Sequence, residues 1–427
     1  MPKLITAQCE LDLNCYPKTN SSSHQPWDAA DLYLIEEATF GSHPAILNDQ
    51  WGALTGFIQL SGASCYSWAD SFCSNTAIKK NLSSQLANQD IKITHTKECM
   101  DLSSSVITSG QIVFPKDTDS LWIQCPKSFD QLHWWLCLAL AQLEPGIPVY
   151  VAGMAKHIPV KWLNWLENHN SDYQQYPIKK KARLMHFKLA DKLPPIVENK
   201  SYLGPDNIDI SAQPGVFSRD HMDIGSRFFI HHLSQLPPLS GKVVDLGCGN
   251  GLLSIAALMY SNHSLIDLIL CDDSALALDA ARKNLLLRDY DKAKFIHTDA
   301  LLNLEGPVDT ILCNPPFHSG NRISTAAAER MFKQASNVLS KQGQLLVVAN
   351  RHLGYITSLK KSFEHVQLLA SDAKFVIYQC SIPKQSSSLK QSPTHRPKSA
   401  HTHKTSSKPA CKASPKRRTA VKTNKHV

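Results

Sequence analysis

The chain has 427 residues, of which 43% are hydrophobic and 19% charged, values typical of soluble globular proteins and of a length that suits two or three domains. Its net charge of +9 comes from the C-terminal end, because residues 381–427 hold 12 of the 45 Lys and Arg residues and no Asp or Glu. No apolar run approaches the roughly 20 residues that a membrane helix needs, and the N-terminal segment shows no apolar signal core. We therefore expect a protein that is neither membrane-bound nor secreted.

The twelve cysteines are scattered along the chain, and no two form a C-x-x-C pair. In a chain of this length the pattern favours reduced thiols in a cytoplasmic protein over a disulfide framework. We also expect no metal site.

Both halves of the chain alternate short β-rich segments with helical ones. The strand candidates of the first half are Ala45–Leu47, Cys65–Trp68, Ile91–Thr94, Leu121–Gln124 and Val149–Ala152. Those of the second half are Lys242–Leu246, Leu265–Cys271, Lys294–His297, Thr310–Cys313, Gln344–Ala349 and Lys374–Cys380, and its helical stretches are Leu252–Tyr260, Ala275–Arg288, Ala326–Ser340 and Thr357–His365. This alternation predicts an α/β fold with doubly wound, parallel sheets, which bind ligands at the carboxyl ends of their strands.

Matching segments indicate that the halves are duplicated. Ser71 precedes Asn81 by ten residues, as Ser274 precedes Asn284. IQCPKSF (Ile123–Phe129) also matches ILCNPPF (Ile311–Phe317). Residues 194–213 lack helical periodicity and carry Pro194, Pro195, Gly204 and Pro205, so we expect a linker at 196–213. The predicted organisation is two tandem Rossmann-like domains, at 1–195 and 214–383.

The second half contains a glycine-rich turn, VVDLGCGNGLLS, between a strand and a helix. Gly247, Gly249 and Gly251 allow a tight turn and a close approach to a ligand. Such a turn also serves dinucleotides. However, the spacing is not G-x-G-x-x-G, and Asp245 suits an amine-bearing ligand better than a pyrophosphate.

Two more carboxylates follow strands of the same sheet. Asp272 ends the second strand, where an acidic side chain can bind both ribose hydroxyls, and Asp299 follows the third, near the expected place of an adenine. Either residue alone could be a helix cap or a turn residue. Three carboxylates at neighbouring strand ends favour a ligand site.

The fourth strand runs into Asn314, Pro315, Pro316 and Phe317. The prolines rigidify the bend, so the Asn314 side-chain oxygen and the Pro315 carbonyl can both accept from a planar NH2 group. When these two oxygens accept hydrogen bonds from both N–H groups, electron density returns to the conjugated nitrogen. Phe317 would stack on the ring that carries the amine.

Together, VVDLGCGNG, CDDS, TDA and NPPF resemble the class I S-adenosylmethionine-dependent methyltransferases that act on nitrogen. Wider segments, among them GVFSRDHMDIGSRFF and VANRHLGY, resemble the bacterial rRNA guanine-N2 methyltransferases, and most closely those that modify 23S rRNA. The resemblance covers about residues 10–382.

This resemblance implies S-adenosylmethionine as cofactor, 23S rRNA as partner and no obligate protein partner. It implies cofactor contacts at Asp245, Gly247, Gly249, Asp272, Asp299 and Asn314, and acceptor contacts at Asn314, Pro315, Pro316 and Phe317. It also suggests that Phe217 and Arg219 close over the methionine end or the base, unless their segment is only a structural lead-in.

The family's N-terminal half is a degenerate methyltransferase domain, and this sequence agrees. Aligning Gly52 with Gly251 puts Asn48 and Gln50 where Gly247 and Gly249 stand. Lys97 takes the position of Asp299. Cys125-Pro126 takes the position of Cys313-Asn314 and contains no Asn. We expect residues 1–195 to hold RNA, helped by Lys179, Lys180, Lys181 and Arg183, although such a run also occurs as a solvated face.

The basic end, residues 384–427, departs from the family pattern. Its Ser-, Thr-, Pro- and Lys-rich composition predicts disorder. It would bind phosphates, or it is a solubilising extension.

Three alternatives to 23S rRNA guanine-N2 methylation stay open. The first is the same reaction on 16S rRNA. The second is protein glutamine methylation, where Tyr is usual at the position of Phe317. The third is a non-catalytic rRNA-binding assembly protein, against which the intact Asp245, Gly247, Gly249 and Asn314 argue.

Overall fold

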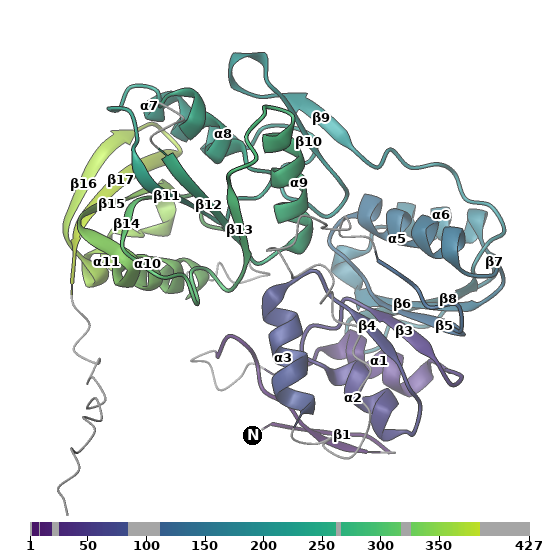
Figure 1. The fold of residues 1–427 in the computed structure, drawn as a ribbon. Coiled ribbons are helices and arrows are strands. Elements are labelled where there is room, and N and C mark those ends of the chain that lie inside the picture. The colour runs from purple at the N-terminus through teal and green to yellow at the C-terminus, as the bar shows by residue number, and fades with distance from the viewer. Residues whose placement is uncertain are drawn as a thin grey trace, which may run out of the picture. The chain divides into compact units, whose positions relative to one another are not determined.

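The computed structural model describes residues 2–7, 9–18, 25–83, 112–261, 266–316 and 326–384. Residues 1–385 form one compact unit, which contains two large mixed sheets (Figure 1). Expected features that fall on Ile91–Thr94, Lys97, Phe317 and 385–427 lie outside the described residues. Within the described ranges, no helix is both long and apolar enough to cross a bilayer, and the cysteines are free thiols.

The C-terminal sheet has seven strands in the order β13-β12-β11-β14-β15-β17-β16. The first five are parallel, and β17 runs antiparallel between β15 and β16. The strands are β11 (Gly241–Leu246), β12 (Ile266–Asp272), β13 (Lys294–His297), β14 (Val308–Cys313), β15 (Leu339–Asn350), β16 (Phe363–Ser371) and β17 (Phe375–Pro383).

Helices cover both faces of this sheet because its central strands are apolar on both sides. Successive residues of β11 show the division: Val243 packs with α7, α8 and α9, whereas Val244 packs with α10 and α11. The helices are α7 (Ile224–Leu233), α8 (Leu252–Met259), α9 (Ala275–Leu286), α10 (Ala326–Val338) and α11 (Ile356–Ser362) (Figure 1). This confirms the predicted doubly wound fold.

The N-terminal sheet repeats that arrangement. Its order, β4-β3-β5-β6-β8-β7, is the order β12-β11-β14-β15-β17-β16 of the other sheet. The strands are β3 (Pro44–Leu47), β4 (Tyr66–Trp68), β5 (Ser120–Gln124), β6 (Pro148–Met154), β7 (Ser171–Gln175) and β8 (Ala182–Lys188). On its two faces lie α1 (Ala29–Glu37), α2 (Ala53–Leu60) and α3 (Phe72–Leu82), and α5 (Phe129–Gln142) and α6 (Val160–His169). The predicted duplication of the fold is confirmed.

The duplication also includes a hairpin ahead of each sheet, β1 (Lys3–Ile5) with β2 (Glu10–Asp12) and β9 (Lys200–Leu203) with β10 (Asp209–Ala212). Asn81 donates to the Asn14 carbonyl behind the first hairpin, as Asn284 donates to the Ser211 carbonyl in the second, at 3.0 and 2.8 Å. Residues 196–213 therefore include a structured part of the second repeat, where we expected only a linker. Each of these strands has only four residues, too few for the alternation of Ile210 and Ala212 in β10 to indicate a strand.

Candidate active site

The glycine turn links β11 to α8 through backbone that favours glycine. Gly247, Gly249 and Gly251 have φ of 76°, 54° and 82°, the left-handed region in which a side chain is costly. A Cβ on Gly251 would lie 3.0 Å from that of Ala281, so this glycine packs the turn against α9. A Cβ on Gly249 would meet no described atom within 4 Å. The turn thus faces open space at Gly249.

Asp245 lies on β11 beneath the turn and is fully buried. Its Oδ2 accepts from the Ser254 amide at 3.0 Å and from the Ser254 hydroxyl at 2.7 Å. Its Oδ1 is also buried, and it has no donor among the described residues. Burial raises the pKa of this carboxyl to about 7, against the lowering effect of the Ser254 hydrogen bonds. One oxygen of Asp245 is therefore ready to accept from a ligand.

Asp272 ends β12 beside the same turn. Its Oδ2 accepts from the Gly249 amide at 2.9 Å, and its Oδ1 accepts from the Ser274 amide at 2.8 Å. Burial raises the pKa of Asp272 to about 6, and the two amide hydrogen bonds oppose this shift. The sheet thus brings Asp272 and Gly249 into direct contact, as their positions at neighbouring strand ends predict.

Asp299 follows β13 and is almost completely buried. Its Oδ1 accepts from the Arg330 Nε at 2.8 Å. Arg330 belongs to α10, so this ion pair joins the end of β13 to that helix. The sequence gives no sign of this partner, because 31 positions separate the two residues.

Asn314 follows β14, and two side chains at the start of α7, those of its cap Asp223 and of Ser226, fix its orientation. Its Nδ2 donates to Asp223 Oδ2 at 3.1 Å and to Ser226 Oγ at 2.9 Å. Because a carboxylate only accepts, the amide nitrogen must face Asp223, and Oδ1 points elsewhere. That Oδ1 is buried and has no donor among the described residues. Asn314 therefore presents a fixed, free acceptor, beside a buried Pro315 and an exposed Pro316.

Sequence reasoning assigned no role to Asp223 or Ser226. Asp223 caps α7 by accepting from the Ser226 amide at 2.8 Å. The same oxygen, Oδ2, also accepts from Asn314 Nδ2. The available signal was an Asp three residues before a Ser at the start of an apolar helix. That signal predicts the cap but not the long-range contact with Asn314.

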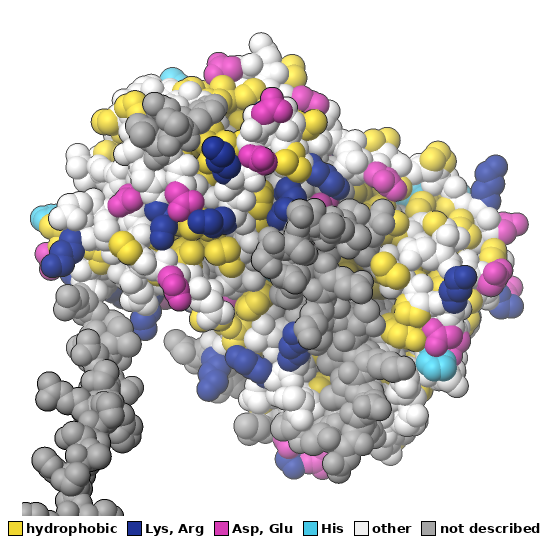
Figure 2. All heavy atoms as spheres, in the orientation of Figure 1, with side chains coloured by type: hydrophobic (Ala, Val, Ile, Leu, Met, Phe, Trp, Pro, Cys, Tyr) yellow, Lys and Arg dark blue, Asp and Glu magenta, His cyan; other side chains and the backbone are white. Residues whose placement is uncertain are grey.

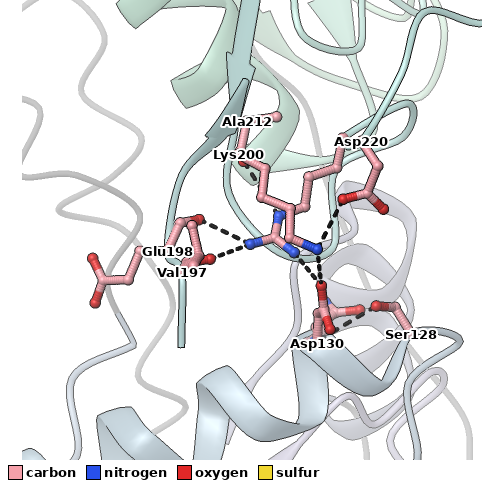
Figure 3. A network of polar contacts seen from close by, with 9 residues as sticks. Ser128, Asp130, Val197, Glu198, Lys200, Ala212 and Asp220 are labelled. Carbon is pink, nitrogen blue, oxygen red and sulfur yellow. Dashed lines mark hydrogen bonds and ion pairs between the residues drawn. The ribbon is translucent and has the colours of Figure 1, made fainter. Parts of the chain in front are cut away.

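For Arg219, the contacts favour the structural alternative over a contact with the ligand. Its side chain is 6% exposed, and its guanidinium pairs with Asp130 of α5 and donates to the carbonyls of Ala212, Val197 and Glu198. Asp130 also pairs with Lys200 (Figure 3). These partners occupy the donors that a ligand would need, so Arg219 joins the two halves of the chain. Phe217, by contrast, is 62% exposed.

Strand registers show what the N-terminal half has lost. With Leu47 matched to Leu246, the neighbours Trp68 and Cys271 correspond, so Ala69 stands where the second half has Asp272. Ile46 likewise replaces Asp245. Asn48 keeps the positive φ of Gly247, at 71°. The turn persists, whereas two of the three strand-end carboxylates are gone.

The same registers correct the sequence match by two residues. Leu47 pairs with Ile123, and Leu246 pairs with Cys313, so the residue in the place of Asn314 is Gln124 and not Pro126. Gln124 Nε2 donates to Asp28 at 3.3 Å and to Asp31 at 2.9 Å. Asp28 caps α1 as Asp223 caps α7. The N-terminal half therefore retains an amide on a helix cap at this position.

The basic run before β8 is only partly free. Lys179 pairs with Glu36 and lies 3.8 Å from Glu37, whereas Lys180 and Lys181 are exposed. Figure 2 shows Lys and Arg side chains interspersed with Asp and Glu on the face in view. The described surface in this view carries no continuous basic field.

Comparisons with known proteins agree with this geometry. The model of the RLMG N-terminal domain matches residues 1–191, and that of the Methyltransferase small domain matches residues 207–379. Ribosomal RNA large subunit methyltransferase G of Alcanivorax borkumensis is 33% identical over 89% of this chain and 97% of its own. The same-named protein of Vibrio cholerae is 34% identical over 88% and 98%.

Among solved structures, the 16S rRNA N2 G1207 methyltransferase of T. thermophilus, in complex with AdoMet and guanosine, has a similar fold. The TM-score is 0.70 at 19% identity, over 89% of this chain and 97% of that one. This likeness spans both sheets and supports the tandem fold.

Proposed function

Since the chain belongs to the family of ribosomal RNA large subunit methyltransferase G, and is thus an S-adenosylmethionine-dependent rRNA methyltransferase, we propose that it methylates the N2 amine of a guanine in 23S rRNA. The reaction takes place at the carboxyl edge of the C-terminal sheet. The observation that carries this proposal is the oriented Asn314 amide, whose Oδ1 is a buried acceptor without a donor among the described residues.

The residues around the glycine turn fit the cofactor. Open space at Gly249 accommodates a ligand against the turn, and Asp245 Oδ1 is a buried acceptor suited to an amino group. Asp272 would bind the ribose hydroxyls and Asp299 would lie near the adenine, with Gly247 shaping the turn. S-adenosylmethionine supplies the electrophilic methyl group.

The chain's own residues prepare the nucleophile. Asn314 Oδ1 and the Pro315 carbonyl would accept hydrogen bonds from the two N–H groups of the guanine amine. This returns electron density to a nitrogen whose lone pair is delocalised. Asp223 and Ser226 keep Oδ1 pointed at the amine. Phe317 would stack on the base, and the fixed bend at Pro315 and Pro316 orients the amine, which contributes several kcal/mol in comparable cases.

Transfer of labelled methyl groups tests the choice of substrate. The protein is incubated with 23S rRNA and 16S rRNA separately, and the modified nucleotide is mapped. We expect N2-methylguanine in 23S rRNA alone. Label in 16S rRNA alone would replace the proposal by its sister activity, and label on a glutamine side chain in added ribosomal protein would point to the alternative reaction. As an enzyme acting on rRNA, the protein would work in the cytoplasm.

We assign RNA binding to residues 1–195, which lack Asp245 and Asp272 equivalents, and supporting phosphate contacts to the basic end.

Deleting residues 385–427 should weaken binding to an rRNA fragment without changing the methylated site, because scattered charges neutralise phosphates but do not position a base. Each phosphate that the truncated protein leaves unneutralised should flatten the log–log salt slope by roughly 0.7 to 0.9. Binding is measured across a salt series. Identical slopes for both proteins would leave the basic end as a solubilising extension.

A further inference from the structure

The two halves of the chain contact each other through equivalent turns, which follow β4 and β12. Ser71 and Ser274 form an antiparallel bridge. The Phe72 amide donates to the Asp273 carbonyl at 2.8 Å, and the Ala275 amide donates to the Asp70 carbonyl at 3.2 Å. These contacts are reciprocal, since Asp70 and Asp273 hold the same position in the two repeats.

The side chains exchange helix caps in the same reciprocal way. Asp70 Oδ1 accepts from the Leu276 amide at 2.8 Å, in the first turn of α9. Asp273 Oδ1 accepts from the Cys73 amide at 2.8 Å, in the first turn of α3. Each half therefore supplies a carboxylate that satisfies an unpaired amide at the start of the other half's helix.

The cap on α9 reaches the proposed cofactor site through one residue. The Ser274 hydroxyl donates to Asp70 Oδ2 at 2.6 Å, while the Ser274 amide donates to Asp272 Oδ1 at 2.8 Å. Asp70 thus holds the residue that orients the Asp272 carboxylate. The first repeat cannot form the corresponding chain of contacts, because Ala69 stands in the place of Asp272.

His297 connects the same junction to the end of β13. Its Nε2 lies 3.1 Å from the Asp70 carbonyl and 2.8 Å from the Asp273 carbonyl. Both oxygens can only accept, so Nε2 carries the proton and donates to both halves. His297 lies two residues before Asp299. The turn after β4 is therefore held against the ends of β12 and β13, which carry Asp272 and Asp299.

We propose that Asp70, in the degenerate half, is a positioning residue for the cofactor site of the other half. It fixes the Ser274 turn and thereby the orientation of Asp272 toward the ribose. This inference rests on the proposed ribose contact of Asp272. It gives the N-terminal half a role in cofactor binding that is separate from its role in holding RNA.

The test compares variants of the full chain in methyl transfer and in calorimetric titration with S-adenosylhomocysteine. Asp70→Ala should raise KM for S-adenosylmethionine and Kd for S-adenosylhomocysteine about tenfold, equivalent to about 1.4 kcal/mol, with kcat and KM for rRNA within about twofold. Asp70→Asn should restore most of the affinity, because its amide can accept from Leu276 and donate to the Ser274 hydroxyl.

Ser71→Ala is the matched control. Ser71 lies at the same interface, where its backbone bridges Ser274, but its hydroxyl caps α3 within the N-terminal half by accepting from the Ser74 amide at 3.1 Å. It should lower Tm about as much as Asp70→Ala without raising KM for S-adenosylmethionine. An equal rise in KM for both alanine variants, or no rise for Asp70→Ala, would overturn the positioning role. If Asp70→Ala does not fold, Asp70→Glu decides, with a several-fold rise expected and an unchanged KM contradicting the proposal.

Asp272→Ala separates this inference from the proposed function. Unchanged affinity for S-adenosylhomocysteine in that variant would remove the assigned ribose contact and with it the role of Asp70. Weakened affinity in Asp272→Ala together with normal affinity in Asp70→Ala would leave the ribose contact in place and overturn the positioning role alone.

Discussion

Replacing Asn314 with alanine should lower kcat for methyl transfer at least about a hundredfold while leaving the affinity for S-adenosylhomocysteine within several-fold. The assigned work of its Oδ1 is on the guanine amine as the nitrogen becomes a nucleophile, and losing a preorganised transition-state hydrogen bond costs roughly 3 kcal/mol or more. Single-turnover kinetics measure the chemical step, and calorimetry measures the cofactor affinity.

The duplication provides an internal control for this experiment. Gln124 occupies the corresponding position of the first repeat and donates to the caps of α1 as Asn314 donates to that of α7. Gln124→Ala should therefore leave kcat within about twofold, although it removes a similar amide from a similar place. Near-normal turnover in Asn314→Ala, or an equal decrease in Gln124→Ala, would contradict the assigned role.

The central strands of both sheets could be predicted because burial on two faces produces continuous apolar runs, such as LILC before Asp272. The edge strand β16 could not. The sequence predicts a helix that continues to His365, but the helix ends at Ser362 and Phe363 begins the strand. Most of its side chains are exposed and it pairs on one side only, so the local sequence carries little strand signal.

The strand-end carboxylates could be found for a similar reason. The position of Asp245, Asp272 and Asp299 relative to their own strands is local, and the topology brings parallel strand ends together. The partners of Asn314, Arg219 and Asp299 could not be found, because they come from distant segments. Two residues of register separate Gln124 from Pro126 as the counterpart of Asn314, and only pairing between strands fixes register.

The repeat also shows how a site decays while its fold persists. Asn48 retains the left-handed backbone of Gly247, and Gly52 begins α2 as Gly251 begins α8. Asp49 accepts from the Thr55 hydroxyl at 2.7 Å, where Asp245 accepts from Ser254. The contacts that close the turn survive, whereas Ile46 and Ala69 replace the carboxylates assigned to the cofactor. The packing of the turn therefore does not depend on the carboxylates assigned to the cofactor.

The affinity for S-adenosylhomocysteine should decrease about tenfold between pH 8 and pH 6. Burial raises the pKa of Asp245 to about 7 in the free protein, so the carboxyl is increasingly neutral below that pH. A ligand whose ammonium group contacts Oδ1 favours the ionised form, and its binding then requires the release of a proton. Calorimetric titrations across this range in buffers of different ionisation enthalpy measure both the affinity and the proton released.

Two comparisons assign the effect to Asp245. Adenosine carries the ribose but no ammonium group. Protonation of the Asp272 carboxyl, whose pKa burial raises to about 6, should therefore change the affinity for both ligands. Protonation of Asp245 should change the affinity for S-adenosylhomocysteine alone. Asp245→Asn should bind S-adenosylhomocysteine more weakly at pH 8 and with little dependence on pH. The ligand-free protein should show the opposite trend in stability: a carboxyl with a raised pKa binds its proton more tightly in the folded state, so the free energy of unfolding falls as pH rises from about 4 to 7. Parallel pH profiles for S-adenosylhomocysteine and adenosine would show that Asp245 does not contact the amino group.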